Sequence, residues 1–131
     1  MLHPNQFKVN EAWIAFRIND RPIMTEKDGG FHCLAVMDAA SCFMLGTEMF
    51  SIAAAPSVFQ VRLLLKKCQA HKQALPRTLY VASDDIAEAV AEEAVRQKIA
   101  VVRVAERDVE VFIGEAKQMF VERFGGAGAL H

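Results

Sequence analysis

Aspartates are the residues of this sequence whose type and position could support catalysis. Asp38 follows an apolar run at 31–37, Asp84 and Asp85 follow another at 78–82, and Asp20 lies just past a third at 12–18. Carboxylates that converge at one edge of a sheet can hold a divalent metal ion. Spacing along the chain does not decide whether these acids converge.

Other kinds of catalytic site find little support. The four histidines are scattered and show no His-x-x-x-His or Cys/His spacing for zinc, and no serine lies in a Gly-x-Ser-x-Gly setting. Cys33, Cys42 and Cys68 lack Cys-x-x-Cys spacing and lie within apolar patterns, so we predict buried, reduced thiols.

Composition predicts a soluble, cytoplasmic protein with no membrane segment. The 131 residues are 53% apolar and 24% charged, and no apolar run reaches the roughly 20 residues that span a bilayer. The first residues show no signal-peptide pattern. We expect one globular domain over 1–124, followed by a flexible tail over 125–131.

Charge is unevenly distributed along the chain. The net charge of −1 provides none of the overall positive field of a typical nucleic-acid binder. Residues 57–77 nevertheless include five Lys and Arg and no acid, whereas residues 84–93 include five acids and no base. We interpret these stretches as two solvated helix faces of opposite sign. The alternative is a nucleic-acid interface on helix 57–72, formed by Arg62, Lys66, Lys67 and Lys72.

Hydrophobic periodicity predicts a mixed α/β fold. Apolar runs at 12–18, 31–37 and 42–50 predict three strands, the last two joined by a turn at 38–41. Helical spacing follows over 57–72, starting at Pro56 and Ser57, and then over 83–98 and 109–120. Short apolar strands at 78–82 and 99–104 separate these helices. A three-strand antiparallel meander, followed by helix, strand, helix, strand and helix, makes a five-stranded mixed sheet.

This order of elements resembles the ribonuclease H-like fold of ribonucleases H, retroviral integrases and transposases. "VMDAASCFMLG" looks like the first-strand Asp and hairpin of integrases, and "LYVASDD" looks like the strand that ends in their second Asp. The resemblance implies two Mg²⁺ or Mn²⁺ ions held between acids of the first strand, the fourth strand and the last helix.

Two alignments to that fold place Asp38 differently. If 31–38 is the first strand, Asp38 and Asp84 match the first two acids. If 12–18 is the first strand, every element is accounted for. Asp38 then ends the second strand, which is antiparallel to the first, and lies roughly 15 to 20 Å from Asp84. We favour the second alignment. Under this alignment Asp20 is the acid nearest the first strand. The acid expected from the last helix is Glu110 or Glu115.

We therefore expect a non-catalytic domain that binds another protein or self-associates as a homo-oligomer. One alternative is a divalent-metal-dependent nuclease or strand-transfer relative that uses Asp38 or Asp20 with Asp84 and Asp85. The other is a nucleic-acid-binding module that uses helix 57–72.

Overall fold

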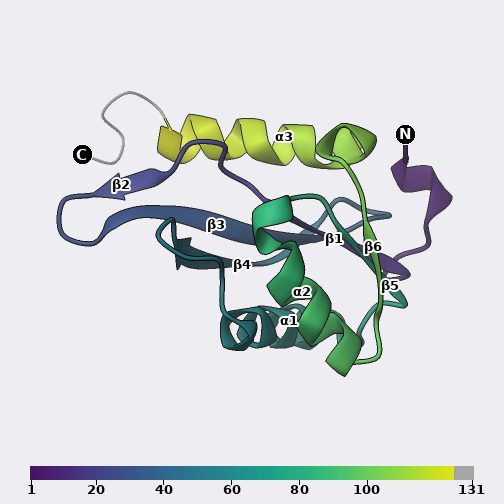
Figure 1. The fold of residues 1–131 in the computed structure, drawn as a ribbon. Coiled ribbons are helices and arrows are strands. Elements are labelled where there is room, and N and C mark those ends of the chain that lie inside the picture. Colours follow the sequence, from purple (N-terminus) through teal and green to yellow (C-terminus); the bar gives the residue numbers. More distant parts are fainter. Residues whose placement is uncertain (126–131) are drawn as a thin grey trace.

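A mixed β-sheet with helices on both faces forms the body of the protein (Figure 1). The computed structural model describes residues 1–125, so the expected flexible tail lies outside the described residues from position 126 onward. The five main strands are β1 (Ala12–Arg17), β3 (Gly29–Asp38), β4 (Met44–Ser51), β5 (Thr78–Val81) and β6 (Ala100–Arg103).

Strand pairing confirms the alignment that begins at residue 12. β1 and β3 pair antiparallel, as do β3 and β4, whereas β1 pairs parallel with β5, and β5 with β6. The main strands therefore lie in the order β4-β3-β1-β5-β6. It is β1, and not β3, that lies beside β5, so 31–38 is not the first strand of the fold.

A sixth strand corrects the prediction of five. β2 (Ile23–Thr25) forms a small hairpin with the first residues of β3, which begins at Gly29 rather than at 31. Gly29 adopts a φ of 76°, and the Thr25 hydroxyl donates to its carbonyl oxygen over 2.8 Å. The segment has a polar composition and only three paired residues, so hydrophobic periodicity does not reveal it.

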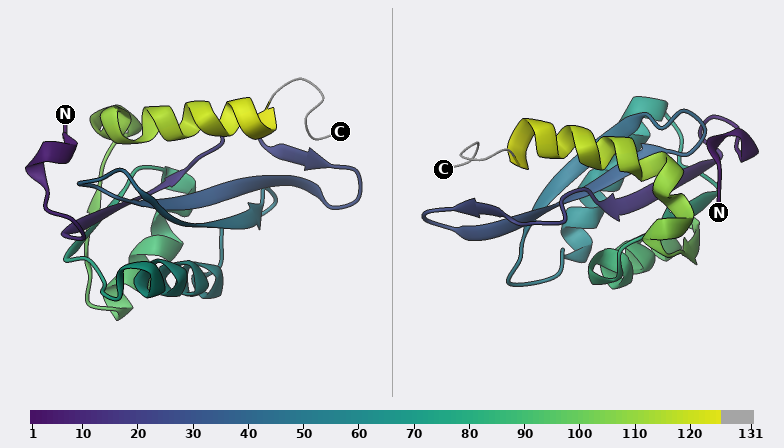
Figure 2. Two further views of the ribbon diagram at one scale, coloured as in Figure 1. Left: turned by 180° about the vertical axis from the view of Figure 1, so that it is seen from behind. Right: turned by 90° about the horizontal axis from the view of Figure 1, so that it is seen from above.

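Helices α1 (Val58–Lys72) and α2 (Asp84–Arg96) cover one face of the sheet, and α3 (Glu110–Phe120) covers the other (Figures 1 and 2). Short 3₁₀ segments lie at Pro4–Gln6 and Glu106–Val109, and a π-helical turn at Val121–Gly125 follows α3. Among the described residues, no helix is long and apolar enough to cross a membrane.

The two core layers follow from the alternation of side chains along β1. Trp13 and Ala15 pack with the α1 and α2 side, whereas Ile14 and Phe16 pack with α3. All four are at most 1% exposed. A strand buried on both faces reads as a continuous apolar run, as 12–16 does.

α1 begins as predicted. Ser57 is its N-cap and forms a capping box with Gln60, each side chain bonding the other residue's backbone N–H. The helix ends at Gln73, which adopts the left-handed conformation.

A buried carboxylate joins α1 to α2. Glu93 has a side chain with no exposed surface, and it accepts hydrogen bonds from Arg96 at 2.8 Å, Gln97 at 2.7 Å and Arg62 at 3.2 Å. Hydrogen bonds from Arg96 lower the pKa of Glu93 most, and hydrogen bonds from Gln97 and Arg62 lower it further. Together they outweigh burial, which raises the pKa, and the pKa falls to about 2. Glu93 is thus a structural ion rather than part of a solvated acidic face.

We predict that Glu93→Gln lowers the free energy of unfolding by roughly 1 to 3 kcal/mol at neutral pH, the usual cost of weakening a buried polar network. Because folding depresses the pKa of Glu93 from 4.5 to about 2, its contribution is complete above pH 4.5 and is lost as the pH falls through 2. Urea denaturation of both proteins should therefore show a difference that shrinks between pH 5 and pH 2.

The control is Glu26→Gln, which changes an exposed glutamate in the β2–β3 hairpin. It should leave stability nearly unchanged at both pH values. A pH-independent difference for Glu93→Gln would show that packing, not ionisation, is responsible.

Candidate functional site

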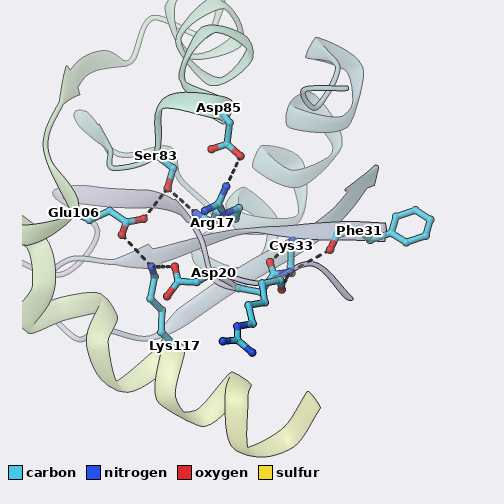
Figure 3. A network of polar contacts seen from close by, with 10 residues as sticks. Arg17, Asp20, Phe31, Cys33, Ser83, Asp85, Glu106 and Lys117 are labelled. Carbon is cyan, nitrogen blue, oxygen red and sulfur yellow. Dashed lines mark hydrogen bonds and ion pairs between the residues drawn. The ribbon is translucent and has the colours of Figure 1, made fainter. Parts of the chain in front are cut away.

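Six polar side chains meet where the parallel strands end, and we call them the strand-end cluster (Figure 3). Parallel strands place their carboxyl ends at the same edge, so the residues that follow β1, β5 and β6 become neighbours. α3 approaches this edge from the other face of the sheet. The cluster consists of Arg17, Asp20, Ser83, Asp85, Glu106 and Lys117.

Arg17 connects the end of β1 to the start of α2. Its Nη1 lies 2.9 Å from Oδ2 of Asp85, and its backbone N–H donates to the Ser83 hydroxyl oxygen over 3.1 Å. The Ser83 hydroxyl in turn donates to Oε1 of Glu106 over 3.3 Å.

The side chain at the start of α2 does not cap the helix. Ser83 is the N-cap, but its hydroxyl makes no capping hydrogen bond. Ser83 contacts Arg17 and Glu106 instead. Asp84 and Asp85 occupy the first turn, where their charge favours the helix dipole.

Lys117 lies between two carboxylates from different parts of the chain. Its Nζ lies 2.7 Å from Oδ1 of Asp20 and 3.1 Å from Oε2 of Glu106, and its side chain is only 15% exposed. Burial acts to lower the pKa of Lys117, but hydrogen bonds to Asp20 and Glu106 outweigh it and raise the pKa above its ordinary value. The ammonium group is therefore a permanent cation at this position.

A polar pocket of about 510 Å³ opens beside the cluster. Its walls are the ends of β1, β5 and β6 with the first turn of α2, and Arg17, Ser83, Asp85 and Glu106 all line it. Asp84 also lines it and is exposed.

The carboxylates at this edge do not fit the pair of metal ions that the resemblance implies. Asp85 is paired with Arg17, while Asp20 and Glu106 share Lys117. From residue 1 to 125, no group of three or more His, Cys, Asp or Glu side chains is arranged to hold a metal ion. Two cationic side chains stand among the acids where the resemblance implies metal ions.

The acids expected from the last helix do not join the cluster. Glu110 and Glu115 are both exposed on α3, and it is Lys117 that reaches the strand ends. Glu115 lies near Cys42 instead, where its charge and that of Asp38 add to burial in raising the pKa of the thiol. α3 itself therefore contributes a base, Lys117, to the cluster, and the nearest acid comes from Glu106 in the turn before that helix.

Asp38 lies at the opposite end of the sheet, as the favoured alignment predicts. It pairs with Trp13 near the start of β1, and its side chain is fully buried. Oδ1 accepts the Asn10 N–H over 2.6 Å, while Oδ2 accepts the Ser41 N–H over 3.0 Å and the Ser41 hydroxyl over 2.7 Å. These bonds satisfy the carboxylate within the β3–β4 turn.

Three of the four predicted nucleic-acid contacts have partners within the chain. Arg62 binds Glu93, Lys67 binds Glu48 at 2.9 Å, and Lys72 lies 5.8 Å from the centre of the Phe43 ring. Lys66 is exposed.

All three cysteines are free thiols, and Cys33 and Cys68 are buried as predicted, whereas Cys42 is only half-buried. Burial raises the pKa of Cys33 to about 11 and that of Cys68 to about 12. At neutral pH both remain protonated.

Sequence reasoning identified Asp20 and Asp85 but missed Arg17, Ser83, Glu106 and Lys117 as members of one cluster. Arg17 carried a signal, because a charge within the apolar run "AFRI" must find a partner. Glu106 and Lys117 carried none, because Lys117 is 97 positions from Asp20.

No protein-family model and no curated protein matches the sequence. Solved structures do match the fold. The catalytic core domain of BIV integrase superposes with a TM-score of 0.54 at 11% identity, over 88% of this chain and 70% of that one. A simian T-cell lymphotropic virus intasome, solved in complex with the PP2A regulatory subunit B56 gamma, gives 0.52 at 14% identity. That match covers 95% of this chain and 43% of the intasome chain. The chain has the ribonuclease H-like fold.

We predict that Asp38→Asn destabilises the protein by roughly 1 to 3 kcal/mol. The NH₂ group of the new amide would face N–H and O–H groups whose hydrogen bonds the carboxylate now accepts. Chemical denaturation with and without Mg²⁺ should give the same loss. Asp28→Asn, in the exposed hairpin turn, is the control. A loss of stability that appears only with Mg²⁺ present would instead make Asp38 a metal ligand.

Proposed function

We propose that this chain, with its ribonuclease H-like fold, is a non-catalytic domain that acts by binding protein. The observation that carries the proposal is the position of Lys117, whose ammonium lies between Asp20 and Glu106. Arg17 neutralises Asp85 in the same cluster. Internal cations thereby take the place that metal ions hold in a nuclease of this fold.

Charge balance supports this reading. Two cations and three carboxylates make up the ionised part of the cluster, so most of the negative charge that would attract a divalent ion is already neutralised. A metal ion would also have to displace an ammonium group that is held by two short contacts and is mostly buried. Removing that ammonium would leave Asp20 and Glu106 close together and uncompensated.

The surface supports a protein partner. Large apolar side chains stay exposed on the helices, including Phe59 at 63% and Leu63 at 39%, one turn apart on α1. Val95 on α2 is 66% exposed. Such groups together on one face are typical of interaction surfaces. We also propose a cytoplasmic location, because the three thiols are unpaired as in reducing compartments.

Nucleic-acid binding has weaker support. Arg62 and Lys67 are held by acids of the same chain, and the net charge is −1. Strong binding to phosphates needs free cations that release counterions.

We predict that millimolar Mn²⁺ causes no specific broadening of amide NMR signals in the wild-type protein. Lys117→Gln should introduce broadening at Asp20 and Glu106, because the variant frees both carboxylates. Lys66→Gln removes an exposed positive charge elsewhere and serves as the matched control. Circular dichroism of each variant checks that the fold is kept.

Specific broadening at Asp84, Asp85 and Glu106 in the wild-type protein, together with Mn²⁺-dependent cleavage of nucleic acid, would overturn the non-catalytic proposal. Broadening equally strong in Lys66→Gln and Lys117→Gln would show that Lys117 does not exclude the ion.

A further inference from the structure

Two side-chain nitrogens are buried without a hydrogen-bond partner in the part of the chain that the structure describes. They are Nε of Arg17 and Nδ1 of His32. Buried polar atoms are nearly always paired in folded proteins, so an unpaired one calls for a physical explanation. These two come from neighbouring strands, β1 and β3.

Both side chains project from the sheet face that α1 and α2 cover. Arg17 is opposite Leu34 in the β1–β3 ladder, and His32 is two residues from Leu34 on the same strand. Alternate residues of a strand share a face, and Leu34 packs in the core layer of α1 and α2. The His32 imidazole is therefore a diagonal neighbour of Arg17, whose Nη1 holds Asp85 of α2 at 2.9 Å (Figure 3).

On its other side the imidazole meets an aromatic ring of β4. Phe50 is opposite His32 in the β3–β4 ladder, and the two ring centres are 5.7 Å apart with their planes tilted by 50°. Glu48, two positions from Phe50 on the same strand, is bound by Lys67 of α1 at 2.9 Å. β4 therefore gives the imidazole a packing contact, and its acid on this face is already paired.

The charges that act on His32 are those of Arg17 and Asp85. Two other charged groups of the covering helices, Arg62 and Glu93, bind each other at 3.1 Å. Burial lowers the pKa of His32 most, the Arg17 charge lowers it further, and the Asp85 charge opposes both. The imidazole is therefore neutral at neutral pH.

A proton on this imidazole would make its present position unfavourable. It would place a second cation beside Arg17 and leave a charged, buried Nδ1–H without an acceptor. Turning toward Asp85, the carboxylate whose charge favours protonation, relieves both effects. The Asp85 side chain is 37% exposed, so a change of partner there needs no repacking of the core.

We propose that His32 is a pH-sensitive latch for the start of α2. Once protonated, its imidazolium competes with Arg17 for the carboxylate of Asp85, and the contact that ties the end of β1 to α2 loosens. The hydrogen bond from the Arg17 backbone N–H to the Ser83 hydroxyl lies next to that contact, as does the strand-end pocket. A fall in pH through the range where histidine titrates thus rearranges the strand-end cluster. The latch does not depend on whether the domain binds protein.

NMR titration of the His32 ring tests its charged neighbours. In the wild-type protein we expect a midpoint below 6.5, the ordinary pKa of histidine. Arg17→Gln should raise the midpoint, because a repelling charge is lost, and Asp85→Asn should lower it, because an attracting charge is lost. Arg103→Gln, which removes an exposed charge from β6, is the matched control and should leave the midpoint unchanged.

Hydrogen exchange tests the latch itself. Protection of the Arg17 backbone N–H, measured against its intrinsic exchange rate at each pH, should fall as the pH drops through the His32 midpoint. In His32→Gln, whose side chain takes up no proton, this protection should stay level. His71→Gln changes an exposed histidine at the end of α1 and should behave as the wild-type protein does. Circular dichroism confirms that each variant is folded.

Stability should follow the same proton. Because folding lowers the pKa of His32 from 6.5, its contribution to stability is complete above pH 6.5 and is lost as the pH falls below that value. Urea denaturation between about pH 7.5 and about pH 5.5 should therefore show a loss in the wild-type protein that is smaller in His32→Gln.

A His32 midpoint at or above 6.5, or one that neither Arg17→Gln nor Asp85→Asn moves, overturns the latch. Equal protection of the Arg17 N–H above and below the midpoint also overturns it. Neither result bears on the Mn²⁺ titration, so the proposed function stands or fails on its own measurement.

Discussion

Burial of β1 on both faces is the constraint on which the rest of the structure depends. Trp13 and Phe16 point to opposite sides, and neither has exposed surface. The strand can satisfy both only at the centre of the sheet, with β3 on one side and β5 on the other. Helices must then cover both faces, as α1 and α2 do on one and α3 does on the other.

The strand-end cluster follows from that central position. β1 ends at Arg17, the first residue of the strand that is not buried, beside the loop that begins α2. A cation at this point neutralises Asp85 in the first turn of α2. Lys117 adds a second cation from the opposite face, and the two carboxylates that bind it keep it charged against the effect of burial.

Buried carboxylates in this protein serve structure. Glu93 is held by two arginines and a glutamine, and Asp38 by two backbone amides and a hydroxyl. Each is compensated by hydrogen bonds, the condition on which a charge can be buried at all. An acid after an apolar strand is therefore no guide to catalysis until its partners are known, which is why Asp38 looked like a ligand in the sequence.

The sequence alone determined the order of the main elements and the start of α1 at Ser57, because periodicity and helix-start preferences are local. It also allowed the placement of Asp38 away from Asp84 once β1 was chosen as the first strand. Only the tertiary structure decided which charges meet. Arg17 and Asp85 are 68 positions apart, and Asp20 and Lys117 are 97 apart. Strand pairing and helix packing bring such residues together, and no local pattern records that.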